Sequence, residues 1–262
     1  MEIIYNNIAT PYVGRLNDNY DFNSVSSRNQ QFGEKTSLHR IIPVSRIKEI
    51  FEGEMTLVNP RLWERNDPYE NFLHKIEFRD EELKGKAFPD KDNFYAQCWA
   101  MEKNSYALWK IYDEKERGIM ISTTVEKLNN SLSGEIDLFL GVIEYLTVEE
   151  LKLLINESPG IKEKIFNPGH YGKIEALLIK RTPYQYEQEV RLIKYSEEND
   201  KRLFKLSGFD PKTLISKITL DPRMSDIEEV AFKKYFKSIG YENVGGKKDE
   251  GGRRVIEKSR ML

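Results

Sequence analysis

The chain has 262 residues, of which 39% are hydrophobic and 32% charged, and its formal net charge is −2. This composition is typical of a globular protein with a sizeable core, in one large domain or two small ones. A near-neutral chain lacks the overall basic field that would indicate a nucleic-acid partner, and leaves room only for a local patch. Cys98 is the only cysteine, which excludes a disulfide framework or a thiolate metal cluster and favours a reducing compartment. The first residues lack the pattern of a signal peptide and no apolar run reaches the ~20 residues of a membrane span, so we expect a cytoplasmic protein without membrane contact.

Along the chain, the segments predict a single domain between two irregular ends. Residues 1–36 show no lasting helical or strand period and are expected to be an irregular arm, whereas residues 244–262 are expected to be a flexible charged tail. Strands are predicted at 38–42, 55–60, 94–101, 117–123, 139–146, 182–195 and 214–220. Helices are predicted at 43–52, 66–73, 105–112, 124–132, 147–158, 171–181 and 226–239. Because these elements interleave without a regular strand-helix-strand cadence, we expect residues 37–243 to form an α+β domain with a mixed or antiparallel sheet flanked by helices.

The segment "NDPYE", residues 66–70, predicts the start of a helix. Asp67 would be the N-cap, Pro68 the first helical residue and Glu70 the partner that closes a capping box. On this interpretation the segment needs no ligand to explain it.

The segment "TPYQYEQEVRLIKY", residues 182–195, predicts a strand with two acids on one face. Side chains alternate along a strand, so Glu187, Glu189 and Arg191 would point the same way. The two carboxylates would lie about 7 Å apart and repel each other by roughly 2 kcal/mol at an effective dielectric near 20. A solvated strand face with an ion pair at its rim is one interpretation. The other is that the carboxylates converge on a cavity, where they stabilise developing positive charge.

Aromatic residues are dense between residues 94 and 112, where core packing is the simplest explanation and a stacking wall for a flat ring is the sharper one. The histidines His39, His74 and His170 lack metal-helix spacing and are expected to be packing or surface residues. Neither a phosphate-binding loop nor a dinucleotide fingerprint is present.

These pieces together resemble a bacterial family known only as a domain of unknown function. The segments that carry the resemblance are "LHRIIPVSRIKEIFEGEMTLVNPRLWERNDPYE", "CWAMEKNSYALWKIYDEKERGIMI", "YQYEQEVRLI" and "LISKITL". They cover residues 38 to about 240, and "NDPYE" and "YEQEVRL" are the most specific of them. The arrangement also looks like a distant ADP-ribosyltransferase with a split sheet, a class with Arg or His on an early strand, Ser or Tyr on a middle strand and Glu on a late strand.

This second resemblance implies NAD as the substrate. Arg40 would take the early basic position and hold the pyrophosphate, with His39 beside it as the alternative. Glu187 and Glu189 would form the Glu-x-Glu pair. Glu189, as the catalytic member, would face the oxocarbenium-like ribose. Glu187 would activate the acceptor as a base, and repulsion within the pair would raise one proton affinity toward neutral pH.

At the middle-strand position the sequence departs from the pattern, because Ala100 stands where the family tends to a serine. Tyr106 or Tyr112 would supply the missing hydroxyl. Tyr106, Trp109 and Tyr112 are also the candidates for stacking on the nicotinamide ring.

Such enzymes in bacteria are often toxins or antiviral effectors, so the resemblance implies a defence role, with RNA or protein as the acceptor and an antitoxin or regulator as a further partner. An RNA acceptor has some support from cations in the tail, which can equally be a solvated tail. These cations are Lys247, Lys248, Arg253, Arg254, Lys258 and Arg260.

Two other classes of function stay open. One is a metal-dependent nuclease that holds Mg²⁺ with Glu175, Glu187 and Glu189, since carboxylates suit hard cations. The other is a binding or sensor module without enzymatic activity, whose charged strand docks a partner.

Overall fold

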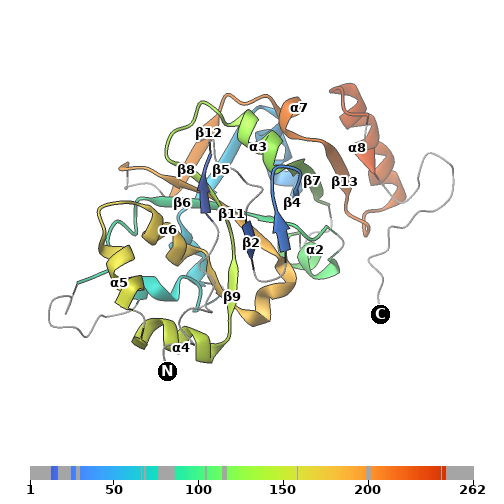
Figure 1. Ribbon diagram of the computed structural model, residues 1–262. Coiled ribbons are helices and arrows are strands. Elements are labelled where there is room, and N and C mark those ends of the chain that lie inside the picture. The colour runs from blue at the N-terminus through green and yellow to red at the C-terminus, as the bar shows by residue number, and fades with distance from the viewer. Residues whose placement is uncertain are drawn as a thin grey trace. The chain divides into compact units, whose positions relative to one another are not determined.

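The computed structural model describes residues 13–16, 25–27, 30–65, 67, 69–75, 86–103, 105–113, 117–157, 159–198, 202–242 and 244–245. The chain groups into two compact units. Unit 1 comprises residues 1–33, 56–98 and 134–205, and unit 2 comprises residues 34–55, 99–133 and 206–262. Strands β5 (Glu54–Val58), β6 (Phe94–Ala100) and β12 (Leu203–Ser207) each begin in one unit and end in the other. Helices combine with a mixed, largely antiparallel sheet, which confirms the predicted α+β class (Figure 1).

The sheet strands of unit 1 follow the order β1, β8, β11, β6, with β5 pairing with β6 at Val58 and Ala96. Strand β8 (Leu138–Val142) is antiparallel both to β1 (Val13–Arg15) and to β11 (Glu189–Tyr195). The first six residues of β11 are buried, so this strand has a neighbour on both edges and a covered surface on both faces. Its charged side chains therefore lie inside the unit.

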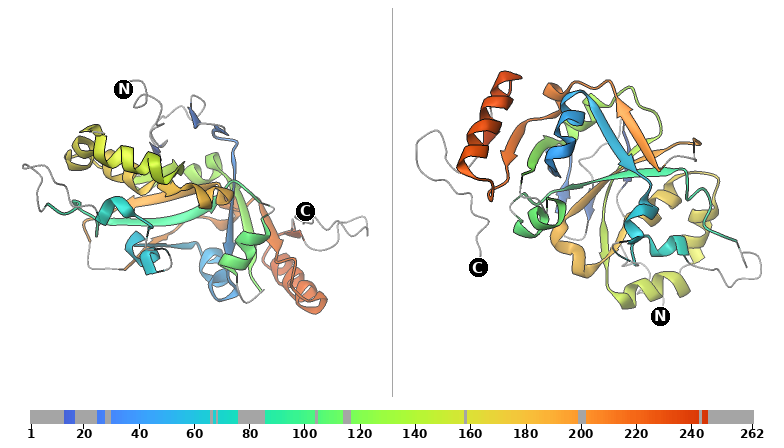
Figure 2. Two further views of the ribbon diagram at one scale, coloured as in Figure 1. Left: turned by 90° about the horizontal axis from the view of Figure 1, so that it is seen from below. Right: turned by 180° about the vertical axis from the view of Figure 1, so that it is seen from behind.

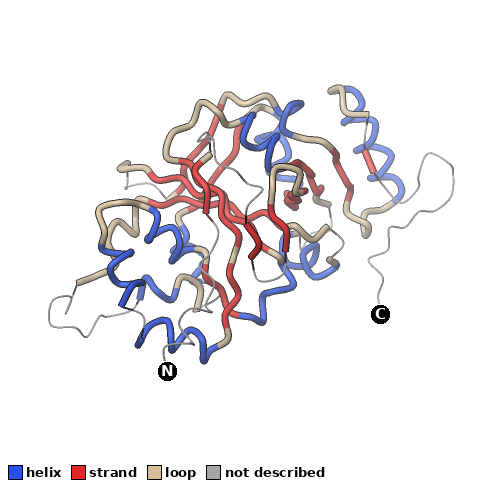
Figure 3. Tube along the Cα trace, viewed as in Figure 1, coloured by secondary structure: helices blue, strands red, loops and turns tan. Residues whose placement is uncertain are grey.

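A second, parallel pair in unit 1 consists of β9 (Glu144–Leu146) and β10 (Ile179–Arg181). Parallel strands need a long crossover connection, and here it contains three helices, α4 (Val148–Glu157), α5 (Pro159–Phe166) and α6 (Tyr171–Leu177). These helices lie together in the ribbon and in the tube (Figures 1 and 3). A short pair, β2 (Val25–Ser27) with β3 (Gln30–Phe32), also lies in this unit.

Helix α6 joins the two cores of unit 1. Its residues Ile174 and Leu177 pack with Phe94, Phe139 and Ile193 of the sheet. On another side, Ala176 packs with residues of α4, α5 and the 3₁₀ helix η5 (Phe72–Lys75). Two more 3₁₀ helices, η4 (Pro60–Arg65) and η6 (Thr182–Glu187), complete the unit.

Unit 2 has the strand order β6, β4, β7, β13, β14. Its strands are β4 (Ser37–Ile42), β7 (Ile119–Thr124), β13 (Lys217–Leu220) and β14 (Val244–Gly245). Its helices are η3 (Val44–Arg46), α1 (Ile47–Phe51), α2 (Tyr106–Tyr112), α3 (Val125–Ser131), α7 (Pro211–Leu214) and α8 (Asp226–Ser238). Figure 2 shows α8 from two further directions, beside β13. No helix among the described residues is long and apolar enough to cross a membrane.

Several predicted boundaries are wrong for local reasons. The strand expected at 182–195 begins only at Glu189, because η6 precedes it. The helix expected at 171–181 ends at Leu177, and the apolar residues after it enter β10. The strand expected at 139–146 is divided into β8 and β9. In the segment expected to be an irregular arm, β1, β2 and β3 are strands. Most of the predicted tail lies outside the described residues, including all six of its cations.

Candidate active site

Strand β11 carries two residues of a buried charged cluster in unit 1. The cluster consists of Glu70, Lys180, Glu187, Glu189 and Arg191. Lys180 lies at its centre. The Lys180 Nζ donates to Glu187 Oε2 at 2.6 Å and to Glu189 Oε2 at 2.9 Å, and Glu70 Oε2 lies 3.8 Å away. Three carboxylates, two from neighbouring residues and one from a distant segment, thus converge on one ammonium group.

Arg191 is the most deeply buried residue of the cluster and binds two of its carboxylates. Its Nε donates to Glu189 Oε1 at 2.7 Å, its Nη2 to Glu70 Oε1 at 2.5 Å, and its Nη1 to the carbonyl oxygen of Leu177. The guanidinium also lies 4.8 Å from the centre of the Trp63 ring. Arg191 is only 1% exposed, so its charge is balanced by these carboxylates and not by water.

Burial excludes one of the two interpretations of the strand. Glu187 and Glu189 are 5% and 2% exposed, so the solvated strand face is wrong. The carboxylates converge on Lys180 inside the protein, and a cavity beside them stays a prediction. The expected repulsion between them is offset by Lys180, which was not predicted because residues 171–181 were expected to be one helix. Strand alternation does put Glu189 and Arg191 on one face, as expected.

The charges of the cluster explain the protonation of Glu187. Three carboxylates and two cations leave one negative charge in excess, and a proton on one acid makes the cluster neutral. Burial, reinforced by the charge of Glu189, raises the pKa of Glu187 to about 7, although Lys180 opposes the shift. The expected rise of one proton affinity toward neutral pH is therefore found at Glu187, with burial as its main cause.

Glu189 has the opposite behaviour. Burial alone would raise its pKa, but Arg191 and Lys180 outweigh burial and hold the pKa well below the usual range. Its backbone N–H donates to the Tyr145 hydroxyl at 2.9 Å. Burial and the charge of Glu189 raise the pKa of Tyr145 and of the Cys98 thiol, so both keep their protons near neutral pH.

The turn before β11 brings the two glutamates together. Pro183 lies in the first turn of η6, for which its fixed φ is suited. Gln188, directly after η6, adopts a left-handed conformation with φ of 43°. Glu187 therefore comes from a helical turn and Glu189 from a strand, yet both reach the same lysine. In side-chain exposure, Lys180 and Glu187 are at 10% and 7%, against 2% for Glu189. The edge of the cluster nearest solvent is the Lys180–Glu187 pair.

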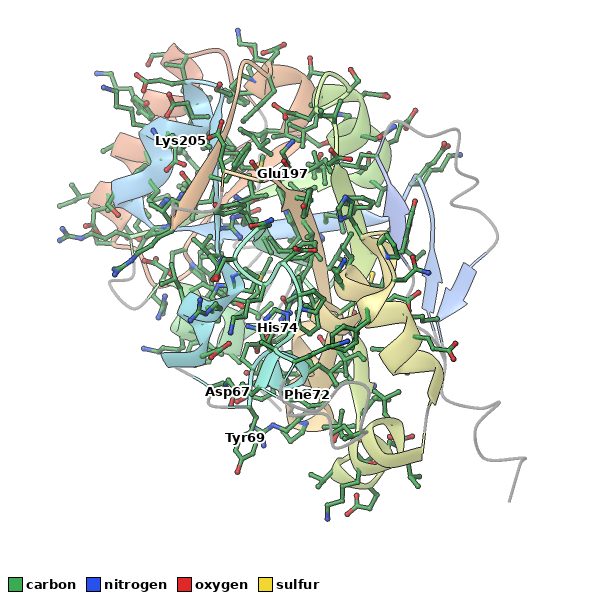
Figure 4. The ribbon with its side chains drawn as sticks, turned by 90° about the vertical axis from the view of Figure 1, so that its left-hand side faces the viewer. Asp67, Tyr69, Phe72, His74, Glu197 and Lys205 are labelled. Carbon is green, nitrogen blue, oxygen red and sulfur yellow. The ribbon has the colours of Figure 1, made fainter. Side chains whose placement is uncertain are left out.

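Beside this edge lies an outer layer of unit 1, formed by Asp67, Tyr69, Arg181 and Tyr184. Arg181 Nη2 donates to both carboxylate oxygens of Asp67, at 3.3 and 3.4 Å. The Arg181 guanidinium also lies 4.2 Å from the Tyr69 ring and 5.5 Å from the Tyr184 ring. Tyr69 is 61% exposed, and its side chain points away from the ribbon near Asp67 (Figure 4). Aromatic rings thus border the cluster on the solvent side.

The capping box predicted for "NDPYE" is wrong. Asn66 and Pro68 lie outside the described residues, and the described residues of this segment, Asp67, Tyr69 and Glu70, are not in an α-helix. The Asp67 carboxylate accepts from the Tyr69 N–H, and η5 begins only at Phe72. The Glu70 carboxylate binds Arg191 instead of capping a helix. Glu70 is therefore a cluster residue that the capping interpretation missed.

The predicted cofactor-binding residues all belong to unit 2, whereas the glutamates belong to unit 1. Arg40 and His39 lie on β4, where His39 is buried and its Nδ1 lies 2.9 Å from Ser122 Oγ. Burial lowers the pKa of His39 to about 4, so its ring is neutral near pH 7. The cations bound to Glu189 are Lys180 and Arg191 of its own unit. Arg40 as a pyrophosphate ligand stays a prediction.

Helix α2 carries the three aromatic candidates. Trp109 is buried, in agreement with core packing, whereas Tyr106 and Tyr112 are 46% and 40% exposed. Ala100, at the middle-strand position, pairs in register with His39. The serine hydroxyl next to His39 comes from Ser122 of β7. A stacking role for Tyr106, Trp109 or Tyr112 stays a prediction.

A magnesium site finds little support in unit 1. The Glu175 carboxylate pairs with Lys164 at 2.9 Å, and Lys180 fills the space between the other two carboxylates. Across the described part of the chain, no group of three His, Cys, Asp or Glu side chains is arranged to hold a metal ion.

His74 is buried as a packing residue against Phe88, at 4.2 Å between ring centres.

No protein-family model, no curated protein and no solved structure matches the chain. The chemistry of the cluster therefore has to be inferred from its own geometry. One of its carboxylates stays ionised and another titrates near neutral pH. Two titratable groups whose pKa values are pushed apart in this way are candidates for an acid–base pair.

Proposed function

We propose that the protein is an NAD-dependent ADP-ribosyltransferase and that the charged cluster of unit 1 is its catalytic site. The observation that carries the proposal is the Glu187–Lys180–Glu189 arrangement, in which the pKa of Glu187 is near 7 and that of Glu189 is far lower. Transfer of ADP-ribose needs a general base for the acceptor and negative charge near the ribose. A base with a pKa close to the working pH is the most effective one.

In this mechanism the bond between nicotinamide N1 and ribose C1′ breaks, and its electron pair leaves with nicotinamide. The ribose then carries positive charge in an oxocarbenium-like state. The acceptor forms a bond to C1′ and gives its proton to ionised Glu187. Glu189 supplies permanent negative charge and positions Lys180 and Arg191. In this mechanism Glu187, and not Glu189 as predicted from the sequence, is the main catalytic residue. The reason is that the oxygens of Glu189 already accept from both cations.

Three further parts of the proposal depend on the family resemblance and on composition. The acceptor is RNA or protein, and the biological role is that of a toxin or an antiviral effector, with an antitoxin or regulator as a partner. A cytoplasmic location agrees with a single free cysteine.

The experiment uses NAD labelled in its adenylate part. The purified protein is incubated with labelled NAD and bacterial lysate, and protein and RNA fractions are counted separately along with free nicotinamide. We expect label in one fraction, and a rate that rises with pH through an apparent pKa near 7. Glu187→Gln should reduce the rate by about 10²- to 10⁴-fold, the usual contribution of a general base.

Glu175→Gln is the matched control, because Glu175 is a glutamate of the same unit that pairs with Lys164 outside the cluster. Its rate should equal that of the wild type. If the wild type consumes no NAD and transfers no label, the transferase proposal fails. Cleavage of RNA or DNA that requires Mg²⁺, stops with EDTA and is lost in Glu175→Gln would instead support the nuclease.

A further inference from the structure

Helix α8 of unit 2 has apolar side chains on two opposite sides. On the inner side, Phe236 is buried and lies 5.3 Å from Phe51 between ring centres, and Phe232 stacks on it at 6.0 Å. On the outer side, Ile227 is 84% exposed and Val230 is 68% exposed. A helix that is apolar on both sides is typical of a helix covered on both sides.

The exposed apolar residues of α8 form one continuous face. At 100° per residue, the outer face consists of Ile227, Val230, Ala231, Lys234 and Tyr235, all of which are exposed. Large apolar side chains that cluster on one exposed face indicate an interaction surface. Their spacing of three, four and eight residues is that of helix-on-helix packing.

We propose that the outer face of α8 packs against α8 of a second copy of the chain, with the two helices antiparallel and Ala231 at the two-fold axis. The charges along the helix favour this partner. Asp226, Glu228 and Glu229 lie in the first turn, where Glu228 also pairs with Arg117 and Glu229 with Lys233. Lys234 and Lys237 lie toward the other end. An antiparallel pair brings the acids of each copy to the lysines of the other, whereas a parallel pair would bring like charges together.

The size of the central side chain agrees with this arrangement. Ala231 is small, so two helices crossing at this residue can approach closely. Residues at equal distances from Ala231 then face each other, so Ile227 of one copy contacts Tyr235 of the other. A 13-residue helix is about 20 Å long, and one such pair buries less than the roughly 800 Å² per partner of a stable complex. We therefore expect a reversible dimer with a dissociation constant of about 10–100 μM.

The first test is sedimentation velocity of the full chain across the micromolar range. We expect a concentration-dependent dimer, which Val230→Glu should weaken at least about tenfold because it places a charge in the centre of the interface. Val148→Glu is the matched control, since Val148 is 51% exposed on α4 of unit 1, and it should dimerise as the wild type does. A monomer at every concentration, or a dimer that Val230→Glu leaves unchanged, would overturn the proposal.

A cysteine scan tests the orientation of the helices. Ala231→Cys should form a disulfide with itself, whereas Ile227→Cys and Tyr235→Cys should cross-link efficiently only when the two variants are mixed. Cys98 does not compete, because burial raises the pKa of its thiol. Efficient self-cross-linking of Ile227→Cys would indicate a parallel pair and contradict the charge argument. Circular dichroism of each variant confirms that the fold is kept.

Discussion

The charged cluster of unit 1 and a second buried cluster in unit 2 differ in where their hydrogen bonds go. The second cluster consists of Asp113, Asp221 and Arg223. Arg223 donates to Asp221 and also to the backbone carbonyls of Trp109 and Asp113, and Asp113 accepts from the Gly118 N–H. Apart from the bonds between Arg223 and Asp221, these bonds join a charged side chain to a backbone group.

In unit 1 the corresponding bonds join charged side chains to one another. Each cluster has one more acid than base, and in each the pKa of one acid is raised, that of Glu187 and that of Asp113. For Asp113 the cause is burial together with the neighbouring Asp221 carboxyl. A raised pKa therefore does not identify a site by itself. What distinguishes unit 1 is that the titrating acid is bound to a lysine at the edge of the cluster instead of to the backbone.

Removal of the arginine should have the largest effect in unit 1. Arg191→Met leaves Glu70 and Glu189 buried with Lys180 as their remaining cation. Breaking a buried ion pair by removing one partner costs about 3–5 kcal/mol. We expect the free energy of unfolding, measured by urea titration at neutral pH, to fall by this amount.

Arg223→Met is the matched substitution in unit 2. It leaves two backbone carbonyls and Asp221 without the guanidinium, which corresponds to a loss of about 1–3 kcal/mol. If the free energy of unfolding falls equally in the two variants, the different bonding of the two clusters does not affect stability.

The sequence predicts part of this cluster correctly. Strand alternation places Glu189 beside Arg191, and the repeated acid two residues earlier draws attention to Glu187. The burial of these groups could not be predicted, because it depends on Glu70, which is distant in sequence, and on Lys180, which was expected to lie in a helix. Lys180 follows an apolar helical pattern that continues into a strand, so local periodicity cannot show where the helix ends.

The predicted elements succeed where caps and periodicity agree. Helix α8 starts with Ser225 and Glu228 in a capping box, and α2 with the side chain of Ser105 bound to the Leu108 N–H. The prediction fails at "NDPYE", where the local pattern also satisfies a capping box. There the tertiary ion pair of Glu70 with Arg191 overrides the local preference, which is a weak one.

The pH dependence of stability separates the two titrating acids. Because the pKa of Glu187 is raised from 4.5 to about 7 in the folded protein, its contribution to stability is present below pH 4.5 and is lost as the pH rises through 7. Glu187→Gln has no carboxyl to ionise, so its free energy of unfolding does not fall in this way. We expect the free energy of unfolding of the variant, relative to that of the wild type, to rise by about 2–3 kcal/mol between pH 4.5 and pH 7. Urea titration at each pH measures this.

Asp113→Asn is the comparison in unit 2. The pKa of Asp113 is also raised, so its contribution is lost with rising pH in the same direction. Asparagine keeps an oxygen for the Gly118 N–H and gains a donor for Asp221. We expect a smaller gain than for Glu187→Gln. If Glu187→Gln shows no pH-dependent gain, Glu187 is ionised at neutral pH and cannot be the group that titrates near 7.

The smallest effect is expected in the outer layer, at the ion pair between Asp67 and Arg181. Burial opposes ionisation of Asp67, but hydrogen bonds from the Tyr69 N–H, the Tyr184 hydroxyl and Arg181 outweigh it and lower the pKa of Asp67. A lowered pKa stabilises the fold above the usual value of 3.8, and this contribution is lost as the pH falls. Asp67→Asn keeps an acceptor for Tyr69 and loses only charge. We expect a cost of about 0.5–1 kcal/mol at neutral pH.

A double-mutant cycle with Arg181→Gln measures how much of this cost belongs to the ion pair. The cost should also shrink in acid, where Asp67 of the wild type is protonated. A cost as large as that of Arg191→Met would show that the outer layer belongs to the same cooperative network as the charged cluster. The edge formed by Lys180 and Glu187 would then be part of a rigid interior, and a base there could not reach an acceptor without the opening of that network.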